Sequence, residues 1–341
     1  MFDRLLRSIS PVATLTAAFA LLIAPAPAQT DAVKTAPAQS GLIHSTHENP
    51  VPEIDGPKNA FVWMVEHKDL KKPSFLFGTM HAGDKRFTRF NDTVKVIFKS
   101  ADAVYTELDM DLMMEEADKL AASLMLPPGE SLSDYVDADV LEDMDKLFRE
   151  VGASVKMLDR FKPIAVTMQL EQLKMMKRYG SAKALDQKIY SAAKRKGKEV
   201  GGVEFMDEQL AAFAALTNEE AGRAMRKAAK HGIKDLKEGR DRLGELAYYY
   251  LLGDEQKIYD YMMQDYDPND ELDVKFMKAL LDDRNVTMAE RTAKMMKENP
   301  NKVHVFAFGT LHFIGPMSVN GMLEEKGFKV TRLTAPEKVG K

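Results

Sequence analysis

The chain of 341 residues contains no cysteine. This absence excludes disulfide bonds, thiolate catalysis, zinc sites with cysteine ligands, iron–sulfur clusters and lipid attachment to a cysteine. An excess of positive charge is also lacking, because the formal net charge is −4 and the isoelectric point is near 6.0. Nucleic-acid-binding proteins typically carry a basic face, so the charge balance argues against a nucleic-acid partner.

Long apolar runs are lacking after the N-terminal region. In that later part of the chain, no apolar run approaches the roughly 20 residues that a membrane-spanning helix needs. The N-terminal run, from Val12 to Ala24, is shorter than such a helix and follows a start that carries Arg4 and Arg7. The small residues Ala26-Pro27-Ala28 come next. This pattern predicts a cleaved signal peptide over residues 1–28 and a periplasmic or secreted protein without a transmembrane segment; an uncleaved anchor is the alternative.

The region after the predicted signal peptide divides into a leader and a domain. Residues 29–56 are rich in alanine, proline, threonine and serine, a composition typical of a flexible leader. The folded domain is predicted over residues 57–335. Its strand-like runs cluster near the two ends, at 61–65, 75–77, 103–106, 303–308 and 328–333.

Between these runs, over about 110–300, apolar residues repeat at three- and four-residue spacings, which predicts helices. The expected helices cover 113–125, 139–151, 163–179, 185–194 and 217–299, with a short strand at 199–203 and breaks at His231-Gly232, Gly253-Asp254 and Asp267-Pro268. We therefore predict an α/β (α+β) fold, in which a central mixed sheet built from N- and C-terminal strands is flanked by helices and accompanied by a largely helical middle region.

A seven-residue motif occurs in two similar copies, one near each end of the predicted domain. Phe75–His81 reads FLFGTMH and Phe306–His312 reads FAFGTLH, so each apolar strand runs into a glycine and, three residues later, a histidine. Proteins with α/β sheets place reactive side chains where strands end. A single copy would suggest a histidine that caps or packs its turn. The repetition instead predicts two neighbouring strands and one site that contains both His81 and His312.

A third candidate is Glu107, which follows the predicted strand at 103–106. It would lie at the same sheet edge if that strand runs parallel to the other two. Two imidazoles and a carboxylate form a common set of ligands for manganese, iron, cobalt or zinc. Such a metal can lower the pKa of a bound water towards 7. The sequence leaves open whether Glu107 is a ligand or a general base.

The sequence also predicts the surroundings of two further residues, Arg284 and His304. Arg284 lies on a predicted helix, where it could stabilise an oxyanion in a water-poor cleft. Its spacing favours the alternative, a surface salt bridge with Asp282 or Asp283. His304, at the start of the last-but-one strand, is expected to be exposed at a strand edge.

These motifs resemble the TraB/PrgY/GumN family, which is similar to the Tiki metalloproteases within a wider group that includes erythromycin esterases and haem-binding ChaN lipoproteins. The resemblance rests on FGTMH at 77–81, on Glu107 in YTEL at 105–108 and on GTLH at 309–312, and it extends from about Phe61 to Leu333. Weaker matches are Leu185-Asp186, Val203-Glu204, Glu208-Gln209, Arg284-Asn285 and 314–328. The resemblance implies metal-dependent peptide cleavage with His81, Glu107 and His312 as ligands, and manganese or cobalt, with zinc as an alternative.

Three functions fit these residues. The first is a periplasmic metal-dependent hydrolase, expected to be a peptidase, with His81, Glu107 and Arg284 as catalytic residues and a peptide or other small molecule as substrate. The second is a non-catalytic envelope protein that sequesters a peptide or a haem-like ligand. The third is a metal-free esterase in which His81 is the general base. The sequence leaves the oligomeric state open.

Overall fold

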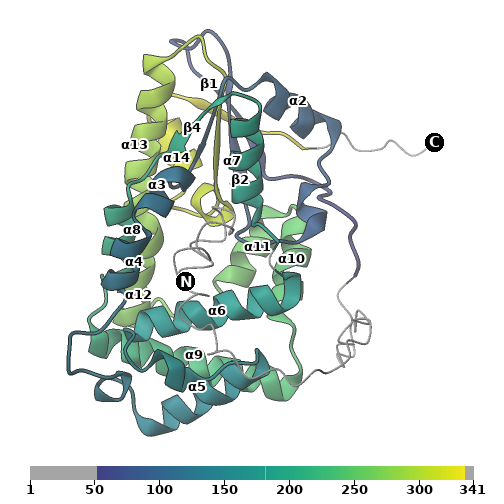
Figure 1. Ribbon diagram of the computed structural model, residues 1–341. Coiled ribbons are helices and arrows are strands. Elements are labelled where there is room, and N and C mark those ends of the chain that lie inside the picture. The colour runs from purple at the N-terminus through teal and green to yellow at the C-terminus, as the bar shows by residue number, and fades with distance from the viewer. Residues whose placement is uncertain (1–51, 181, 335–341) are drawn as a thin grey trace, which may run out of the picture.

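The computed structural model describes residues 52–180 and 182–334 (Figure 1). The predicted signal peptide, and the predicted leader up to residue 51, lie outside these described residues. Residues 52–56, the end of that leader, are described, and Ile54 is buried in the core that surrounds the sheet. No helix in the described part of the chain is both long and apolar enough to cross a bilayer.

A six-stranded mixed sheet forms the upper half of the molecule in Figure 1. Its strands are β1 (Val62–Glu66), β2 (Ser74–Thr79), β3 (Ala103–Thr106), β4 (Glu199–Gly202), β5 (His304–Gly309) and β6 (Lys329–Arg332). They lie in the order β4-β3-β5-β2-β1-β6. The four strands β2 to β5 are parallel to one another, and β1 is antiparallel to both of its neighbours. Strands from both ends of the chain therefore build one sheet, which confirms the predicted α/β fold.

The strands that contain the two copies of the repeated motif are hydrogen-bonded neighbours. In the parallel pair of β2 and β5, Gly78 is opposite Phe308 and Thr79 is opposite Gly309. Their apolar side chains are buried, as expected for parallel strands covered on both faces. This pairing brings the turns that follow the two strands to the same edge of the sheet.

Helices cover the sheet and form a second layer below it (Figure 1). The helices are α2 (Asp92–Ser100), α3 (Met110–Glu115), α4 (Ala117–Ser123), α5 (Ala138–Glu150), α6 (Pro163–Tyr179), α7 (Leu185–Arg195), α8 (Met206–Phe213), α9 (Asn218–Glu238), α10 (Arg242–Leu252), α11 (Glu255–Met262), α12 (Glu271–Met277), α13 (Asp283–Glu298) and α14 (Val319–Glu325). A π-helical turn, η5 (Lys278–Asp282), joins α12 to α13, and a 3-10 turn, η6 (Thr310–Phe313), follows β5.

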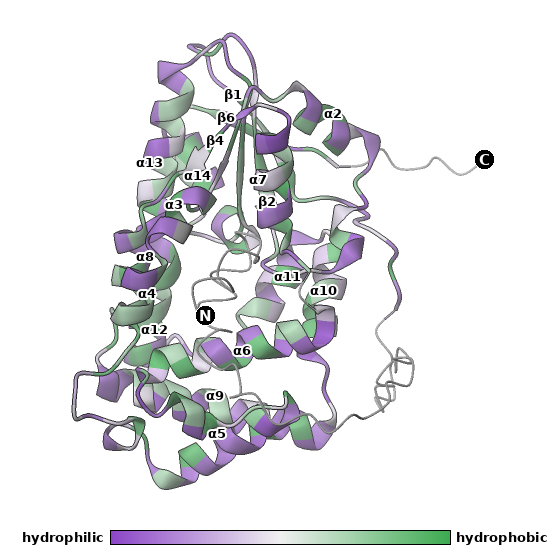
Figure 2. Ribbon diagram, in the orientation of Figure 1, coloured by the Kyte–Doolittle hydropathy of each residue, from purple (hydrophilic) through white to green (hydrophobic). Residues whose placement is uncertain are grey.

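The buried apolar residues form two clusters, one around the sheet and one within the helical layer of α4, α5, α6 and α9. Figure 2 shows hydrophilic and hydrophobic bands alternating along α5 and α6, as expected for amphipathic helices that bury one face. The sheet therefore has its own core, and the helical middle region has another.

Three expectations from the sequence are wrong in detail. The break predicted at His231-Gly232 is absent, because α9 continues to Glu238; a Cβ on Gly232 would lie 2.7 Å from a methyl group of Leu147, so glycine here permits close packing against α5. The helix predicted over 113–125 is divided into α3 and α4. His304 is 1% exposed rather than exposed at an edge, because β5 lies inside the sheet.

Candidate active site

The three predicted metal-binding side chains meet at the carboxyl edge of the sheet. Parallel pairing of β3 with β5, and of β5 with β2, satisfies the condition that places Glu107 beside the two histidine turns. Oε1 of Glu107 lies 3.5 Å from Nε2 of His81 and 3.8 Å from Nε2 of His312. Residues from both ends of the chain thus surround a single carboxylate oxygen.

The Glu107 carboxylate is held at both oxygens. Oε1 accepts a hydrogen bond of 2.7 Å from the backbone N–H of Gly309, and Oε2 accepts one of 2.9 Å from Arg284. Burial alone would raise the pKa of Glu107, but His312, His81 and Arg284 together hold that pKa well below its usual value. The carboxylate is therefore ionised at neutral pH.

Each site histidine is oriented through its Nδ1 atom. Nδ1 of His81 lies 3.0 Å from Oδ2 of Asp186, and Nδ1 of His312 lies 2.6 Å from Oδ1 of Asn285. Asn285 is itself fixed, because its Nδ2 donates to the backbone oxygen of Met317 at 2.7 Å. An oxygen acceptor at Nδ1 favours a proton there, so that the lone pair of the neutral ring lies on Nε2, the nitrogen nearer Glu107. Metal-binding histidines are typically oriented in this way.

The two imidazoles differ in charge. Burial lowers the pKa of His312 to about 4, so that its ring is neutral at pH 7. Desolvation of the part of its ring that faces the site opposes the charged form of His81 as well, but Asp186 and Glu107 outweigh this effect and raise the pKa of His81 well above its usual value. The His81 side chain is 57% exposed, whereas that of His312 is 6% exposed. His81 therefore forms the open, protonated side of the site.

Arg284 belongs to this site and not to the surface. It is 12% exposed, and its carboxylate partners are Glu107 at 2.9 Å and Glu204 at 2.6 Å, so the expected salt bridge with Asp282 or Asp283 is wrong. The guanidinium also donates from Nε to Glu204 at 2.9 Å and from Nη1 to the Leu280 backbone oxygen at 2.9 Å. These bonds use four of the five N–H groups of an arginine. Among the residues that the structure describes, one N–H of Nη1 is left for another acceptor.

The model of the TraB/PrgY/gumN family matches residues 61–332. The chain belongs to the TraB/PrgY/gumN family. This family member is similar to the metalloprotease TIKI2 of Danio rerio, with 25% identity over 358 residues, covering 88% of the chain and 67% of the relative. It is also similar to the metalloprotease TIKI2 of Xenopus tropicalis, with 26% identity, covering 84% of the chain and 62% of the relative.

Human metalloprotease TIKI1 shows 25% identity to this TraB/PrgY/gumN member, with 83% of the chain and 64% of the relative covered. The chain therefore spans about two thirds, or slightly less, of the length of these curated relatives. No solved structure matches it significantly.

Sequence reasoning did not assign a role to Glu204, Asp186, Asn285 or Gln209, which the structure of this family member brings to the site. Glu204 follows β4 closely, as Glu107 follows β3, and its N–H donates to the Glu107 backbone oxygen at 2.7 Å. Gln209 lies 3.3 Å from Glu204 and 3.5 Å from Glu107. A carboxylate just after a parallel strand was thus a signal that could have identified Glu204.

The fit of a divalent metal to the site depends on both residue types and spacing. Within residues 52–180 and 182–334, no group of three or more His, Asp or Glu side chains is already arranged as a metal site. The Nε2 to Oε1 separations of 3.5 and 3.8 Å exceed the roughly 3.0–3.4 Å between ligands that bind at about 2.1 Å.

Gly309 leaves room for the histidines and Glu107 to move closer together, as metal binding requires. A Cβ on this residue would lie 3.2 Å from both Oε1 of Glu107 and Nε2 of His81. The donor types, the occupied Nδ1 atoms and this open space fit a divalent metal, provided that the side chains move together slightly.

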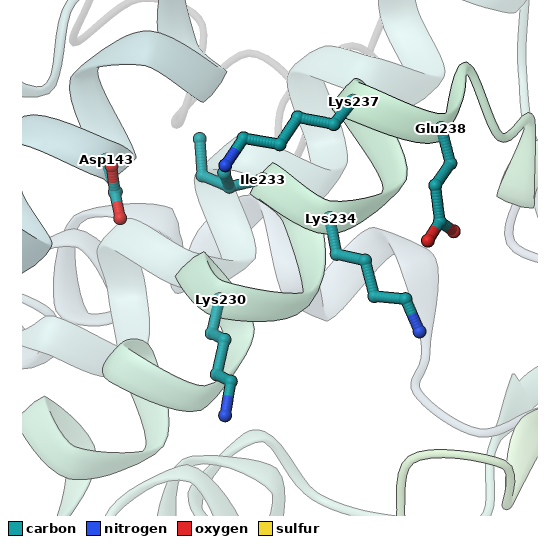
Figure 3. A pocket seen from close by; sticks show the side chains of 6 residues that line it. All are labelled: Asp143, Lys230, Ile233, Lys234, Lys237 and Glu238. Atoms are coloured by element: carbon teal, nitrogen blue, oxygen red, sulfur yellow. The ribbon is translucent and has the colours of Figure 1, made fainter.

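A hollow of about 410 Å³ lies between α5 and α9 of this TraB/PrgY/gumN member (Figure 3). Its lining residues are Asp143, Lys230, Ile233, Lys234, Lys237 and Glu238. None of the candidate catalytic residues lines it. The lysines extend from one helix as a solvated face, so this hollow is not part of the site.

Proposed function

We propose that this protein is a divalent-metal-dependent hydrolase that cleaves peptide bonds and acts after export, in the periplasm or outside the cell. The observation that carries the proposal is the convergence of His81 and His312 on one oxygen of Glu107. The metalloprotease names of the similar proteins support peptide cleavage. Manganese or cobalt is the proposed metal, with zinc as the alternative.

Nε2 of His81, Nε2 of His312 and the Glu107 carboxylate would hold the metal. When bound, a divalent metal lowers the pKa of a water ligand and polarises a carbonyl oxygen. The neutral ring of His312 is already in the state that a ligand needs, whereas His81 must first release its proton. The exposed side chain of His81 provides a route for that proton to solvent.

The remaining residues orient these groups. Asp186 and Asn285 hold the imidazoles, and Arg284 fixes the carboxylate of Glu107. The Nη1 N–H of Arg284 that has no partner within the described residues is proposed to donate to the substrate carbonyl oxygen. Oε1 of Glu107 faces both histidines and would be the ligand atom, which leaves Oε2 to Arg284.

The contact of His81 with Asp186 also supports a second candidate, a metal-free esterase. A histidine whose Nδ1 is held by a carboxylate is the arrangement of a general base in acyl transfer. That chemistry would survive a chelator. The raised pKa of His81 disfavours it, because a general base must be unprotonated.

The test is the bound-metal stoichiometry of the exported protein after exposure to manganese, cobalt or zinc. We expect near-stoichiometric metal in the parent and none in the His81→Ala/His312→Ala variant. A His231→Ala variant, whose histidine lies away from the site, should keep the metal. Peptide hydrolysis should require the metal and be lost in Glu107→Gln. Hydrolysis that persists in chelator would contradict the metal mechanism and favour the esterase.

A further inference from the structure

A smaller hollow, of about 190 Å³, lies next to the candidate active site, between the α3–α4 segment and the start of α8. Glu204 lines this hollow, and the same residue binds Arg284 in the site. The chain segments on its two sides are joined where the Glu204 N–H donates to the Glu107 backbone oxygen. A ligand that occupies the hollow would therefore lie close to Glu107.

Part of the lining is apolar, and two large apolar side chains remain accessible there. The apolar lining residues include Leu112, Met113, Phe205 and Met206. Phe205 is 65% exposed and Leu112 is 50% exposed. The guanidinium of Arg291 lies 4.9 Å from the centre of the Phe205 ring, so one side of this ring already faces a cation. Neighbouring exposed apolar side chains beside a candidate site favour a role in ligand contact.

The other part of the lining is acidic. Its carboxylates are Asp109, Glu116, Glu204 and Asp207, and the lining contains neither lysine nor arginine. Of the lining carboxylates, Asp207 pairs with Lys119 at 2.5 Å, and Asp109 accepts from the Tyr190 hydroxyl at 2.7 Å. Glu116 forms no ion pair within the part of the chain that the structure describes. Lys119 is close enough to interact with Glu116 but pairs directly with Asp207, so the Glu116 carboxylate keeps room for a ligand cation.

We propose that this hollow, the acidic groove, is a substrate subsite that binds a lysine or arginine side chain of a peptide. The aliphatic stem would pack on Leu112 and Phe205, and the cation would lie near Glu116. Long basic side chains combine an apolar stem with a charged end, which matches this lining. The statement that the ligand is a substrate rests on the proposed function, whereas the preference for a basic side chain does not.

Binding is measured in a chelator, so that no hydrolysis is required. The probes are acetylated, amidated Ala-Ala-X-Ala-Ala peptides in which X is lysine or norleucine, which has a similar aliphatic stem without the charge. Carbon-13 labels on methionine methyl groups report the groove through Met113 and Met206. We expect these signals to shift at about two- to fivefold lower concentration of the lysine peptide, as for a partly exposed ion pair.

Two variants test the origin of that preference. Glu116→Gln should make the two peptides bind equally, whereas Glu115→Gln, which removes the same charge from an exposed neighbour that does not line the groove, should keep the preference. Phe205→Ala should weaken binding of both peptides. Equal binding of the two peptides to the parent, or equal effects of Glu115→Gln and Glu116→Gln, would overturn the inference.

A separate hydrolysis assay with added metal distinguishes this inference from the proposed function. If no peptide is cleaved but the Glu116-dependent preference remains, the proposed function fails and the acidic groove stands. If peptides are cleaved and the binding preference is absent, the acidic groove alone fails.

Discussion

The backbone N–H of Gly309 donates a hydrogen bond of 2.7 Å to Oε1 of Glu107. This contact joins the second copy of the repeated motif to the carboxylate that follows β3. The absent side chain of Gly309 matters as well, because a Cβ there would lie 3.2 Å from both Oε1 of Glu107 and Nε2 of His81. One glycine thus orients the carboxylate and leaves space between the proposed ligands.

The substitution Gly309→Ala is predicted to weaken metal binding about tenfold or more, the size of effect typical when ligands lose their orientation. The backbone at Gly309 has φ −51° and ψ 137°, which alanine adopts without strain, so the effect comes from crowding of Glu107 and His81. Metal titration measures it. Gly321→Ala is the control, because the described atom nearest to its Cβ would be Ser318 Oγ, at an ordinary contact distance of 3.6 Å. Unchanged affinity in Gly309→Ala would contradict the proposed ligand positions.

The substitution Glu204→Gln is predicted to lower the free energy of unfolding by about 3 kcal/mol, since it leaves a buried arginine with an incomplete set of charged partners. The Glu204 side chain is 1% exposed and that of Arg284 is 12% exposed. Urea denaturation at pH 7 measures the change. Glu208→Gln, in the neighbouring pair with Arg291 whose side chains are 36% and 30% exposed, should cost about 0–1 kcal/mol. Similar losses in the two variants would contradict a structural role for the buried pair.

The sequence predicted the sheet and the central three residues because their signals are local. His81, Glu107 and His312 each follow a short apolar strand, and parallel strands bring such positions to one edge. The repeated motif also indicated that the strands before His81 and His312 are neighbours. Parallel pairing of β3 was the one condition that the local pattern left open.

The residues that support the site could not be assigned in this way. Asp186 and Asn285 lie on helices, and their approach to the histidines depends on how α7 and α13 pack against the sheet. For Arg284, the nearby Asp282 and Asp283 gave a plausible local partner, although the partners that bind it are Glu107 and Glu204, far away in the chain. The burial of His304 likewise follows from strand order, which no local spacing encodes.

The two site histidines are predicted to titrate far apart in the metal-free protein. The pKa of His312 is lowered to about 4, so the unfolded chain binds a proton between about pH 6.5 and 4 that the folded protein does not bind. His312 therefore makes the protein less stable as the pH falls through that range. The pKa of His81 is raised, so its contribution to stability is present below about pH 6.5 and is lost as the pH rises through its pKa in the folded protein.

Asp186→Asn tests the cause of this separation. Removing the carboxylate on Nδ1 should lower the pKa of His81 and leave that of His312 near 4, because Asp186 raises only the former. Carbon-13 chemical shifts of the imidazole Cε1 atoms, followed against pH in chelator, give both values in the parent and the variant. Titration of both histidines near 6.5 in the parent would contradict the site electrostatics. An unchanged pKa of His81 in Asp186→Asn would instead assign the shift to Glu107, the remaining carboxylate at Nε2.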